Sequence, residues 1–337
     1  MLKIFRNIFV VALSLFLLCS CFDDKGKKSN QRTTGSAPYE MLVLANKAWT
    51  STSDGELFLQ AINPYIPGLP RAENCFRLTI IDPVDFNNTF KVYANIVSVD
   101  IDKKYRKADM KMARDVYAHP QIILSVVAPD YVQLMQLMDS VKGTVNELFV
   151  KSELDREMEY LAKKNSGKVK VAVRKMFGAD INVPRDIESM KLGDSFIWAS
   201  AETRLNDLNF CMYSLPYTST DNFTESHLLA QRDSIMEIYV RGDKDDQYMT
   251  TDTSTVSSRS ITVNKHFVFE YRGLWAMKND MMGGPFVAYA QVDTANNRIL
   301  VCEGFVFAPD KNKRNLIREM EASLRTLKLP ASKNTNK

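Results

Sequence analysis

ILVCEGFVFAPD, residues 299–310, is the stretch from which the fold of this chain is best predicted. An apolar run of this length indicates a buried strand, and the Ala-Pro-Asp that follows ends it. The same order occurs earlier, where IILSVVAPD at residues 122–130 precedes an amphipathic helix. After residue 310, apolar residues again recur at intervals of three or four, as in such a helix: Leu316, Ile317, Met320, Leu324 and Leu327.

The recurrence of strand, Ala-Pro-Asp and helix suggests an internal duplication. A proline near the start of a helix is common, so chance is the alternative explanation. We predict an α+β fold, with antiparallel sheets and amphipathic helices packed on one face, in two related halves. The expected halves are residues 39–178 and residues 179–330, followed by a disordered tail at residues 331–337.

The other elements follow from apolar runs and turn residues. In the first half, strands are expected at residues 39–45, 75–81, 94–101 and 121–128, with helices at 54–63 and after 130. In the second half, strands are expected at residues 196–201, 209–215, 261–272, 285–292 and 299–307, with a helix at 223–239.

The N-terminal segment has the pattern of an export signal. Lys3 and Arg6 precede an apolar run from residue 8 to residue 18, which is too short to span a bilayer because about 20 residues are needed. Leu18-Cys19-Ser20-Cys21 closes the run and resembles a bacterial lipoprotein signal, in which Cys21 receives a diacylglyceryl group. An ordinary signal peptide cleaved nearby is the alternative. We expect a signal peptide at residues 1–20, a lipid on Cys21 and a flexible tether at residues 21–38.

This pattern predicts a place in the cell envelope, with the chain bound to the outer membrane through the lipid on Cys21. Asp23 and Asp24 resemble the acidic signals that send some Bacteroidota-type lipoproteins to the cell surface. The three lysines that follow depart from that pattern, so the periplasm and the cell surface both stay open.

Composition and charge are those of an ordinary folded protein, with 45% hydrophobic and 25% charged residues. The formal net charge is +4, from 44 Lys and Arg against 40 Asp and Glu. Lys3, Arg6 and the basic tether supply most of this excess, so the folded part is close to neutral. A near-neutral surface argues against a nucleic-acid partner.

Three cysteines remain beyond the expected lipidation site: Cys75, Cys211 and Cys302. One disulfide with one free thiol is an option in an oxidising envelope. Three buried, reduced cysteines that behave as small apolar residues are the favoured alternative.

No catalytic motif occurs in the sequence. His119, His227 and His266 are not at metal-ligand spacing, and no serine elbow, phosphate-binding loop or dinucleotide fingerprint is present. We therefore assign no catalytic residue, no cofactor and no metal ligand. Glu270 and Glu303 fall in expected strands and could face one another as acid and base, although a strand glutamate more often lies on a solvated face.

Five stretches carry a resemblance to a known family: IPGLP (66–70), DVYAHPQ (115–121), QRDS (231–234), RGLWAMKNDMMGGPF (272–286) and FVFAPDKNKRNLIR (305–318). They resemble the domain of unknown function 4837 family of Bacteroidota-type envelope lipoproteins, over residues 39–329. The resemblance implies an envelope lipoprotein. It brings no catalytic residues, because the family has no established activity.

The segment 272–286 is the candidate binding surface, since a connecting segment with an aromatic ring, charges and two glycines suits recognition. The alternative is a wide hairpin whose Trp and Met residues fill the edge of the core. The residues that would bind are Arg272, Trp275, Lys278, Asp280, Gly283 and Gly284.

Together these patterns predict a lipid-tethered, non-enzymatic module that binds or scaffolds a protein, glycan or peptidoglycan partner. The alternative is an envelope hydrolase of unrecognised type, in which Glu270, Glu303 or a histidine acts as acid or base.

Overall fold

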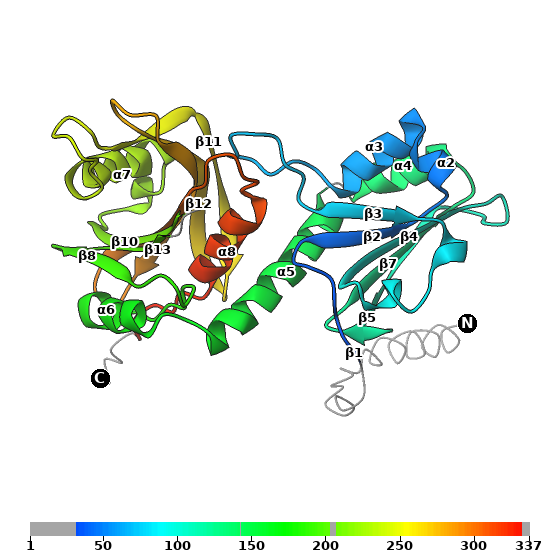
Figure 1. Cartoon of the computed structure of the whole chain (residues 1–337), viewed down its shortest axis with the longest axis horizontal. Coiled ribbons are helices and arrows are strands. Elements are labelled where there is room, and N and C mark those ends of the chain that lie inside the picture. Colours follow the sequence, from blue (N-terminus) through cyan, green and yellow to red (C-terminus); the bar gives the residue numbers. More distant parts are fainter. Residues whose placement is uncertain (1–31, 142, 203–206, 332–337) are drawn as a thin grey trace, which may run out of the picture.

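The protein is described here from a computed structural model, which covers residues 32–141, 143–202 and 207–331. The described chain forms two lobes, and helix α5 (Thr144–Lys163) runs diagonally between them (Figure 1). Each lobe combines a sheet with helices, which confirms the α+β class. The expected signal peptide, Cys21 and the tail from residue 332 onward lie outside the described residues.

The first lobe contains a five-stranded sheet in the order β3-β2-β4-β7-β5. Strand β2 reads EMLVL and is buried along its length, as expected for a strand covered on both faces. The pairs β2/β3, β2/β4 and β4/β7 are parallel, whereas β5 pairs antiparallel with β7. The strands are β2 (Glu40–Leu44), β3 (Arg77–Ile81), β4 (Asn95–Ile101), β5 (Asp109–Arg114) and β7 (Ile122–Ala128).

Helices cover one face of this sheet, and short turns cover the other. Phe58, Leu134 and Phe149 come from three different helices and pack into one apolar core with the sheet. On the opposite face, Phe86 and Phe90 pack against buried strand residues. The covering elements are α2 (Lys47–Thr50), α3 (Ser53–Ile62), α4 (Tyr131–Ser140) and α5 on the first face, with the 3₁₀ turns η1 (Pro83–Asp85) and η2 (Phe90–Val92) on the second.

Residues 32–38, which the sequence placed in the tether, are fixed to the first lobe. Strand β1 (Arg32–Thr33) pairs in parallel with β6 (Ala118–His119). The Gly35 amide also donates a hydrogen bond to the Val92 carbonyl at 3.0 Å. Any free tether therefore ends before Arg32, not at residue 38.

The second lobe contains a seven-stranded antiparallel sheet in the order β11-β12-β13-β14-β10-β9-β8. Its middle strands are buried on both faces, which explains the continuous apolar run from residue 299. The strands are β8 (Ser189–Gly193), β9 (Phe196–Glu202), β10 (Asp207–Pro216), β11 (Met249–Val263), β12 (His266–Met277), β13 (Gly283–Asp293) and β14 (Arg298–Phe307).

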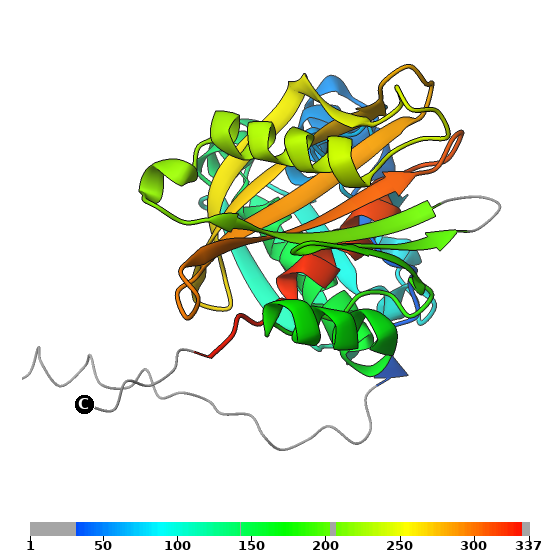
Figure 2. The ribbon, with the colours of Figure 1, turned by 90° about the vertical axis from the view of Figure 1, so that its left-hand side faces the viewer.

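Helices cover both faces of this second sheet, where the sequence predicted one. Helix α7 (Glu225–Tyr239), after the 3₁₀ turn η3 (Thr220–Asn222), crosses one face (Figure 2). Helices α6 (Gly167–Phe177) and α8 (Arg314–Arg325) pack on the other. Helix α6 therefore belongs to the second lobe, although the expected boundary at residue 178 put it in the first half.

Helix α8 lies between the two lobes. Ile317 and Met320 pack on the second sheet, while Ala322 lies in the core of the first lobe beside α5. The start of α8 has no side-chain cap of its own. Instead, Glu73 from the first lobe accepts hydrogen bonds from the amides of Lys313 and Arg314, at 2.7 and 3.0 Å. The helix is thus held by both lobes.

The two lobes differ in topology. Strand β7 lies between a parallel and an antiparallel neighbour, whereas both neighbours of β14 are antiparallel. Asp130 caps α4 by accepting from the Gln133 amide, but α8 begins only at Arg314, beyond Asp310. The internal duplication suggested by the repeated Ala-Pro-Asp is therefore wrong.

Two further findings concern the thiols and the helices. Cys75, Cys211 and Cys302 are all buried and free, which agrees with the favoured alternative of three reduced cysteines.

Within the described ranges, no helix is both long and apolar enough to cross a membrane.

Candidate functional site

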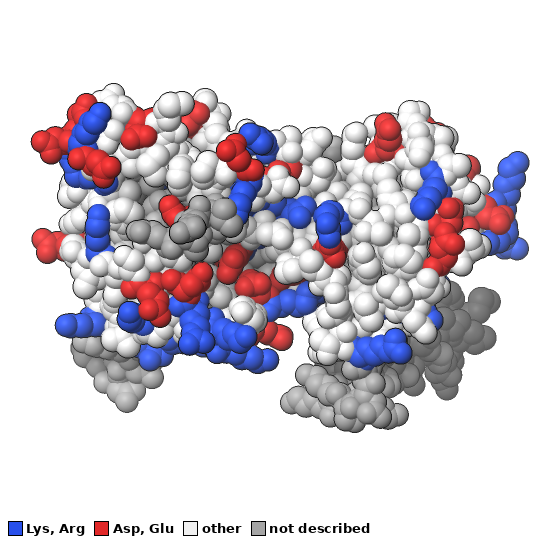
Figure 3. All heavy atoms as spheres, viewed as in Figure 1, with Lys and Arg blue, Asp and Glu red and all other residues white. Residues whose placement is uncertain are grey.

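A cleft of about 600 Å³ opens where the two lobes meet. We call it the interlobe cleft. The first lobe contributes the turn around Tyr65 and the start of α5 as far as Leu154. The second lobe contributes β11, β12 and α8. Charged side chains lie along the middle of the molecule between the lobes (Figure 3).

Four arginines and two buried glutamates line this cleft. Three of these six residues, Arg318, Glu321 and Arg325, are at positions i, i+3 and i+7 of α8, a spacing that puts them on one face of the helix. Two others are two residues apart in β12 and so share one face of the sheet. The six residues are Arg259 from β11, Glu270 and Arg272 from β12, and Arg318, Glu321 and Arg325 from α8.

Glu321 is surrounded by guanidinium groups. Its Oε2 lies 2.6 Å from Arg318 Nη1 and 3.2 Å from Arg272 Nη2, and its Oε1 lies 3.6 Å from Arg325 Nη2. Burial by itself raises the pKa of this carboxyl, but attraction by the three arginines outweighs it and holds the pKa well below its usual range. Glu321 is therefore a fixed negative charge.

Only one of the two carboxylate oxygens of Glu270 accepts hydrogen bonds from the described residues. Its Oε1 accepts from Arg272 Nε at 3.1 Å and from Arg259 Nε at 3.0 Å. Its Oε2 is buried and has no hydrogen-bond partner among the described residues. Arg318 Nε and Arg325 Nε are likewise buried donors without a partner there. Buried polar groups normally have partners, so three unpaired atoms in one cleft are notable.

The predicted binding residues do not form one surface. Arg272 and Trp275 point to opposite faces of β12, so Arg272 lies in the interlobe cleft while Trp275 lies in the core under α7. The Trp275 side chain is only 2% exposed, its Nε1 donates to the Val306 carbonyl at 3.3 Å, and its ring meets Phe305 edge-on. For Trp275 the structure agrees with the alternative, a side chain that fills the core.

The other predicted binding residues lie in or beside the turn after β12. Lys278 Nζ donates to the Tyr248 hydroxyl at 2.6 Å, and Asp280 accepts from Gln247 Nε2 at 3.0 Å. Gly283 and Gly284 begin β13. A Cβ on Gly284 would fall 2.0 Å from the Val306 carbonyl oxygen, so this glycine is needed for strand packing. Binding by Lys278 and Asp280 stays a prediction.

Glu270 and Glu303 do not face one another, contrary to the option left open by the sequence. Both are in strands and both are buried, but Glu270 faces α8 whereas Glu303 faces α7. Glu303 forms a two-point ion pair with Arg232 of α7, at 2.7 and 2.9 Å, and both side chains are fully buried. Burial raises the pKa of Glu303 although Arg232 opposes this effect.

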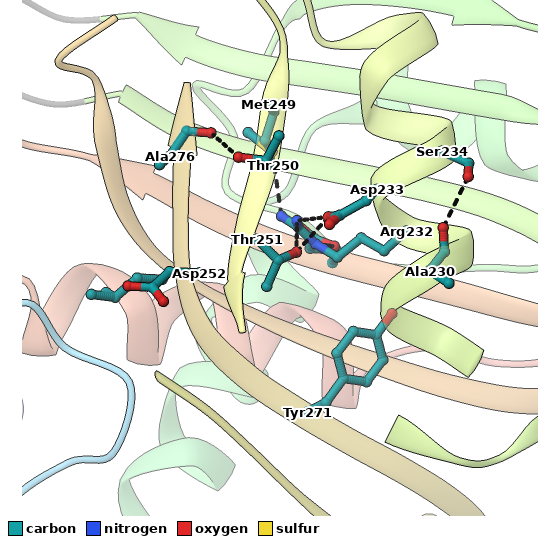
Figure 4. Close-up of polar contacts among 12 residues, drawn as sticks. Ala230, Arg232, Asp233, Ser234, Met249, Thr250, Thr251, Asp252, Tyr271 and Ala276 are labelled. Carbon is teal, nitrogen blue, oxygen red and sulfur yellow. Dashed lines mark hydrogen bonds and ion pairs between the residues drawn. The ribbon is translucent and has the colours of Figure 1, made fainter. Parts of the chain in front are cut away.

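The Arg232 side chain is fully buried and points toward Asp233 and Thr251 (Figure 4). Its Nη1 donates to the Thr251 hydroxyl at 2.7 Å, and that hydroxyl donates to Asp233 at 2.5 Å. The guanidinium also lies over the Phe286 ring, 4.2 Å from its centre. We interpret the pair of Arg232 and Glu303 as part of the core, because each of their charged atoms has a partner and neither residue lines the interlobe cleft.

The three histidines lie elsewhere. His119 contacts Asp115 at 3.0 Å on the first lobe, His227 is on α7, and His266 begins β12. None of the three lines the interlobe cleft. Across the part of the chain that the structure describes, no three His, Cys, Asp or Glu side chains gather as metal ligands.

The sequence analysis named Arg272 as a binding residue and Glu270 as a possible acid or base. It assigned no role to Arg259, Arg318, Glu321 or Arg325. One signal was present. The two segments that carry the family resemblance most strongly, residues 272–286 and 305–318, contribute Arg272 and Arg318, and these two arginines meet at Glu321.

The comparison with known proteins assigns no activity to this chain. No curated protein matches the chain. Among solved structures, the Ran-binding protein Mog1p of Saccharomyces cerevisiae is similar at 8% identity, over 45% of this chain and 89% of that one, with a TM-score of 0.30. A protein of Bacteroides thetaiotaomicron is similar at 12% identity, over 45% of each chain, with a TM-score of 0.20. Likeness this low carries no conclusion about function.

Two family descriptions match the chain, one for each lobe. Residues 34–162 match "Domain of unknown function (DUF8532)", which spans the first lobe and nearly all of α5. Residues 165–326 match "Domain of unknown function (DUF4837)", which spans the second lobe from α6 to the end of α8. The stretches IPGLP and DVYAHPQ thus fall in the first of these, and QRDS and the two strongest stretches in the second. The predicted resemblance to the domain of unknown function 4837 family is therefore confirmed for the second lobe, over residues 165–326, and not for residues 39–329.

Proposed function

We propose that this protein is a lipid-anchored, non-enzymatic binding module of the bacterial cell envelope, which holds its partner in the interlobe cleft. The observation that carries the proposal is the cleft itself. It is built by both lobes, it is lined by four arginines, and three buried polar atoms in it have no partner in the described chain. A ligand that supplies these partners would remove the cost of burying them.

The chemistry of the cleft favours binding over catalysis. General acid–base catalysis needs a group that exchanges a proton near neutral pH. Arginine stays charged at all ordinary pH values, and the pKa of Glu321 lies well below its usual range. With no histidine in its lining, the cleft is better suited to holding a charged ligand than to transforming one.

The anchor proposed is a diacylglyceryl group on Cys21, at the outer membrane. The motif Leu18-Cys19-Ser20-Cys21 and the apolar run before it support this. The first lobe is fixed from Arg32 onward, so the ten residues between Cys21 and Arg32 would form the tether. A coil of that length spans about 15–20 Å, which keeps the lobes close to the membrane surface.

The anchor is tested by replacing the lipidated cysteine. Cys21→Ser should release the protein from washed membranes, whereas the matched variant Cys19→Ser should leave it bound. The measurement is the amount of protein in the membrane pellet after a carbonate wash. If Cys21→Ser still sediments with the membranes, the lipid anchor is wrong.

The binding role is tested by photo-cross-linking in intact cells. A photoreactive amino acid at Ser257, an exposed lining residue of β11 that pairs with Arg272, should give a discrete adduct of one size. The same group at Ile238, exposed at 63% on α7, is the control and should give none. The absence of any adduct specific to Ser257 would count against a partner in the cleft.

A further inference from the structure

We infer that the interlobe cleft recognises a small ligand, or the end of a larger one, that carries a carboxylate or phosphate next to a hydroxyl or amino group. The inference rests on the proposed function and specifies the chemistry of the ligand. It follows from three features of the cleft: an excess of positive charge, unpaired donors and one unpaired acceptor.

The first feature is the charge. Arg259, Arg272, Arg318 and Arg325 surround only two buried carboxylates, Glu270 and Glu321. The cleft therefore holds two more guanidinium groups than buried carboxylates. Lys151 and Glu147 at its rim cancel one another. Arg259 is 51% exposed and is therefore largely compensated by water, whereas Arg325 is only 19% exposed. An anionic ligand would compensate the charge of Arg325.

The second feature is the unpaired donors. Arg318 Nε and Arg325 Nε are buried without a hydrogen-bond partner in the described chain, and both belong to one face of α8. The Arg318 side chain is only 7% exposed. The planar fork of a guanidinium group fits the paired oxygens of a carboxylate or a phosphate. The two donors thus point to an oxyanion as one half of the ligand.

The third feature is the unpaired acceptor. Glu270 Oε2 is buried and unpaired, on a side chain that is 3% exposed. An ionised carboxylate only accepts hydrogen bonds, so its partner must be an N–H or O–H group. The arginines that contact Glu270 both reach its other oxygen, Oε1. A ligand hydroxyl or amino group would therefore complete this site.

The ion pairs of Glu270 and Glu321 do not serve to hold the two lobes together. All the arginines that contact Glu270 and Glu321 come from the second lobe, as do the two glutamates. The ion pair that reaches across is Arg259 to Glu147, at 3.7 Å, and both of these side chains are at least half exposed. Exposed pairs of this kind contribute little to stability.

The size of the cleft sets the scale of the ligand. A volume of about 600 Å³ falls in the range of small-molecule sites. Ile261 and Leu154 give it apolar walls, and Tyr65 and Ser257 stand at its lining with polar groups. A small organic acid, or the terminal group of a polymer, would fit this mixture.

The test is calorimetric titration of the full chain in detergent, at constant ionic strength, with three probes. Lactate carries a carboxylate beside a hydroxyl, propionate has the same carbon chain without the hydroxyl, and inorganic phosphate is the tetrahedral oxyanion. We expect saturable binding of lactate or phosphate. Propionate should bind about tenfold more weakly than lactate, because it leaves Glu270 Oε2 unpaired. Tighter binding of phosphate than of lactate would identify the oxyanion as phosphate.

Two variants locate the binding. Arg325→Gln removes a partly exposed guanidinium group and should lower the affinity for the bound probe at least tenfold. Arg174→Gln is the matched control, since Arg174 is an exposed arginine of α6 that pairs with Asp180 outside the cleft. Arg259→Gln, at the rim, serves as a second cleft variant if Arg325→Gln does not fold.

Three results would overturn the inference: no saturable heat with any probe, equal affinity for lactate and propionate, or unchanged affinity in both cleft variants. If the probes fail but a photoreactive group at Ser257 still gives its adduct, the cleft binds a partner whose chemistry differs from that inferred here. In that case the proposed function stands and the ligand class is wrong.

Discussion

Glu73 of the first lobe caps helix α8 of the second, with its two carboxylate oxygens 2.7 and 3.0 Å from the amides of Lys313 and Arg314. The first turn of a helix has amides without partners inside the helix, and a carboxylate there also meets the positive end of the helix dipole. The positions of the two lobes are therefore linked through a cap that normally comes from the residue just before a helix.

Loss of this cap should lower stability and loosen the junction. Glu73→Gln keeps the size of the side chain but loses its charge, and Glu73→Ala loses both hydrogen bonds. We expect the free energy of unfolding to fall by about 1–2 kcal/mol in Glu73→Ala and by less in Glu73→Gln. Urea unfolding measures this. Glu159→Ala, at an exposed site on α5, is the control and should unfold like the wild type.

Substitution of Trp275 distinguishes a role in the core from a role in binding. Because its indole is buried and hydrogen-bonded to Val306, Trp275→Ala should lower the free energy of unfolding by about 3–5 kcal/mol. Tyr160→Ala, at a side chain that is 51% exposed, is the comparison and should change stability little. A melting midpoint of Trp275→Ala within a degree of the wild type would contradict the packing described.

The buried pair of Arg232 and Glu303 predicts a non-additive result. Glu303→Gln leaves a fully buried guanidinium without its counter-charge and should cost about 3–5 kcal/mol. The double variant Arg232→Met with Glu303→Leu removes both charges and should recover most of that loss. If the double variant is no more stable than Glu303→Gln, the charge is not what destabilises the single variant.

Glu319 should make stability depend on pH. Burial, followed by repulsion from Glu157 and Asp186, raises its pKa to about 7. Below about pH 4.5 the carboxyl is protonated in the folded and the unfolded chain alike. Between pH 4.5 and 7 the unfolded chain releases the proton while the folded chain still holds it, so stability falls as pH rises.

Glu319→Gln should remove this part of the pH dependence. The variant should match the wild type near pH 4 and exceed it above pH 7 by about 1–2 kcal/mol, allowing for the partial exposure of the side chain. Urea unfolding at a series of pH values gives the difference directly. A constant difference between the two proteins from pH 4 to pH 8 would show that Glu319 does not titrate as described.

Much of the sheet structure was predictable, because buried strands leave continuous apolar runs. The expected strands at residues 94–101, 121–128 and 299–307 differ from β4, β7 and β14 by one residue at most. The polar edge strands β5, β8 and β11 were not predicted, since a strand exposed on one or both faces has no such run. The strand expected at 261–272 in fact spans a hairpin turn at Asn264 and Lys265.

The candidate site was harder to predict, for a physical reason. Arg318, Glu321 and Arg325 form a charged stripe on α8, and such stripes are usually solvated. Arg318 and Glu321 are buried here and Arg325 is only 19% exposed, because α5 of the first lobe packs beside the same helix. The contact between α5 and α8 joins residues more than 150 positions apart, so no local sequence pattern predicts it. Arg272 was named as a binding residue without its partners.

The position of α8 between the lobes also has a consequence for synthesis. Ala322 completes the core of the first lobe, yet it lies near the end of the chain. A chain that emerges from its N-terminus onward therefore cannot finish its first lobe, or form the interlobe cleft, until α8 at residues 314–325 has left the ribosome. Because α8 contributes to the cores of both lobes, a chain without this helix would leave apolar surface of both lobes exposed to proteolysis.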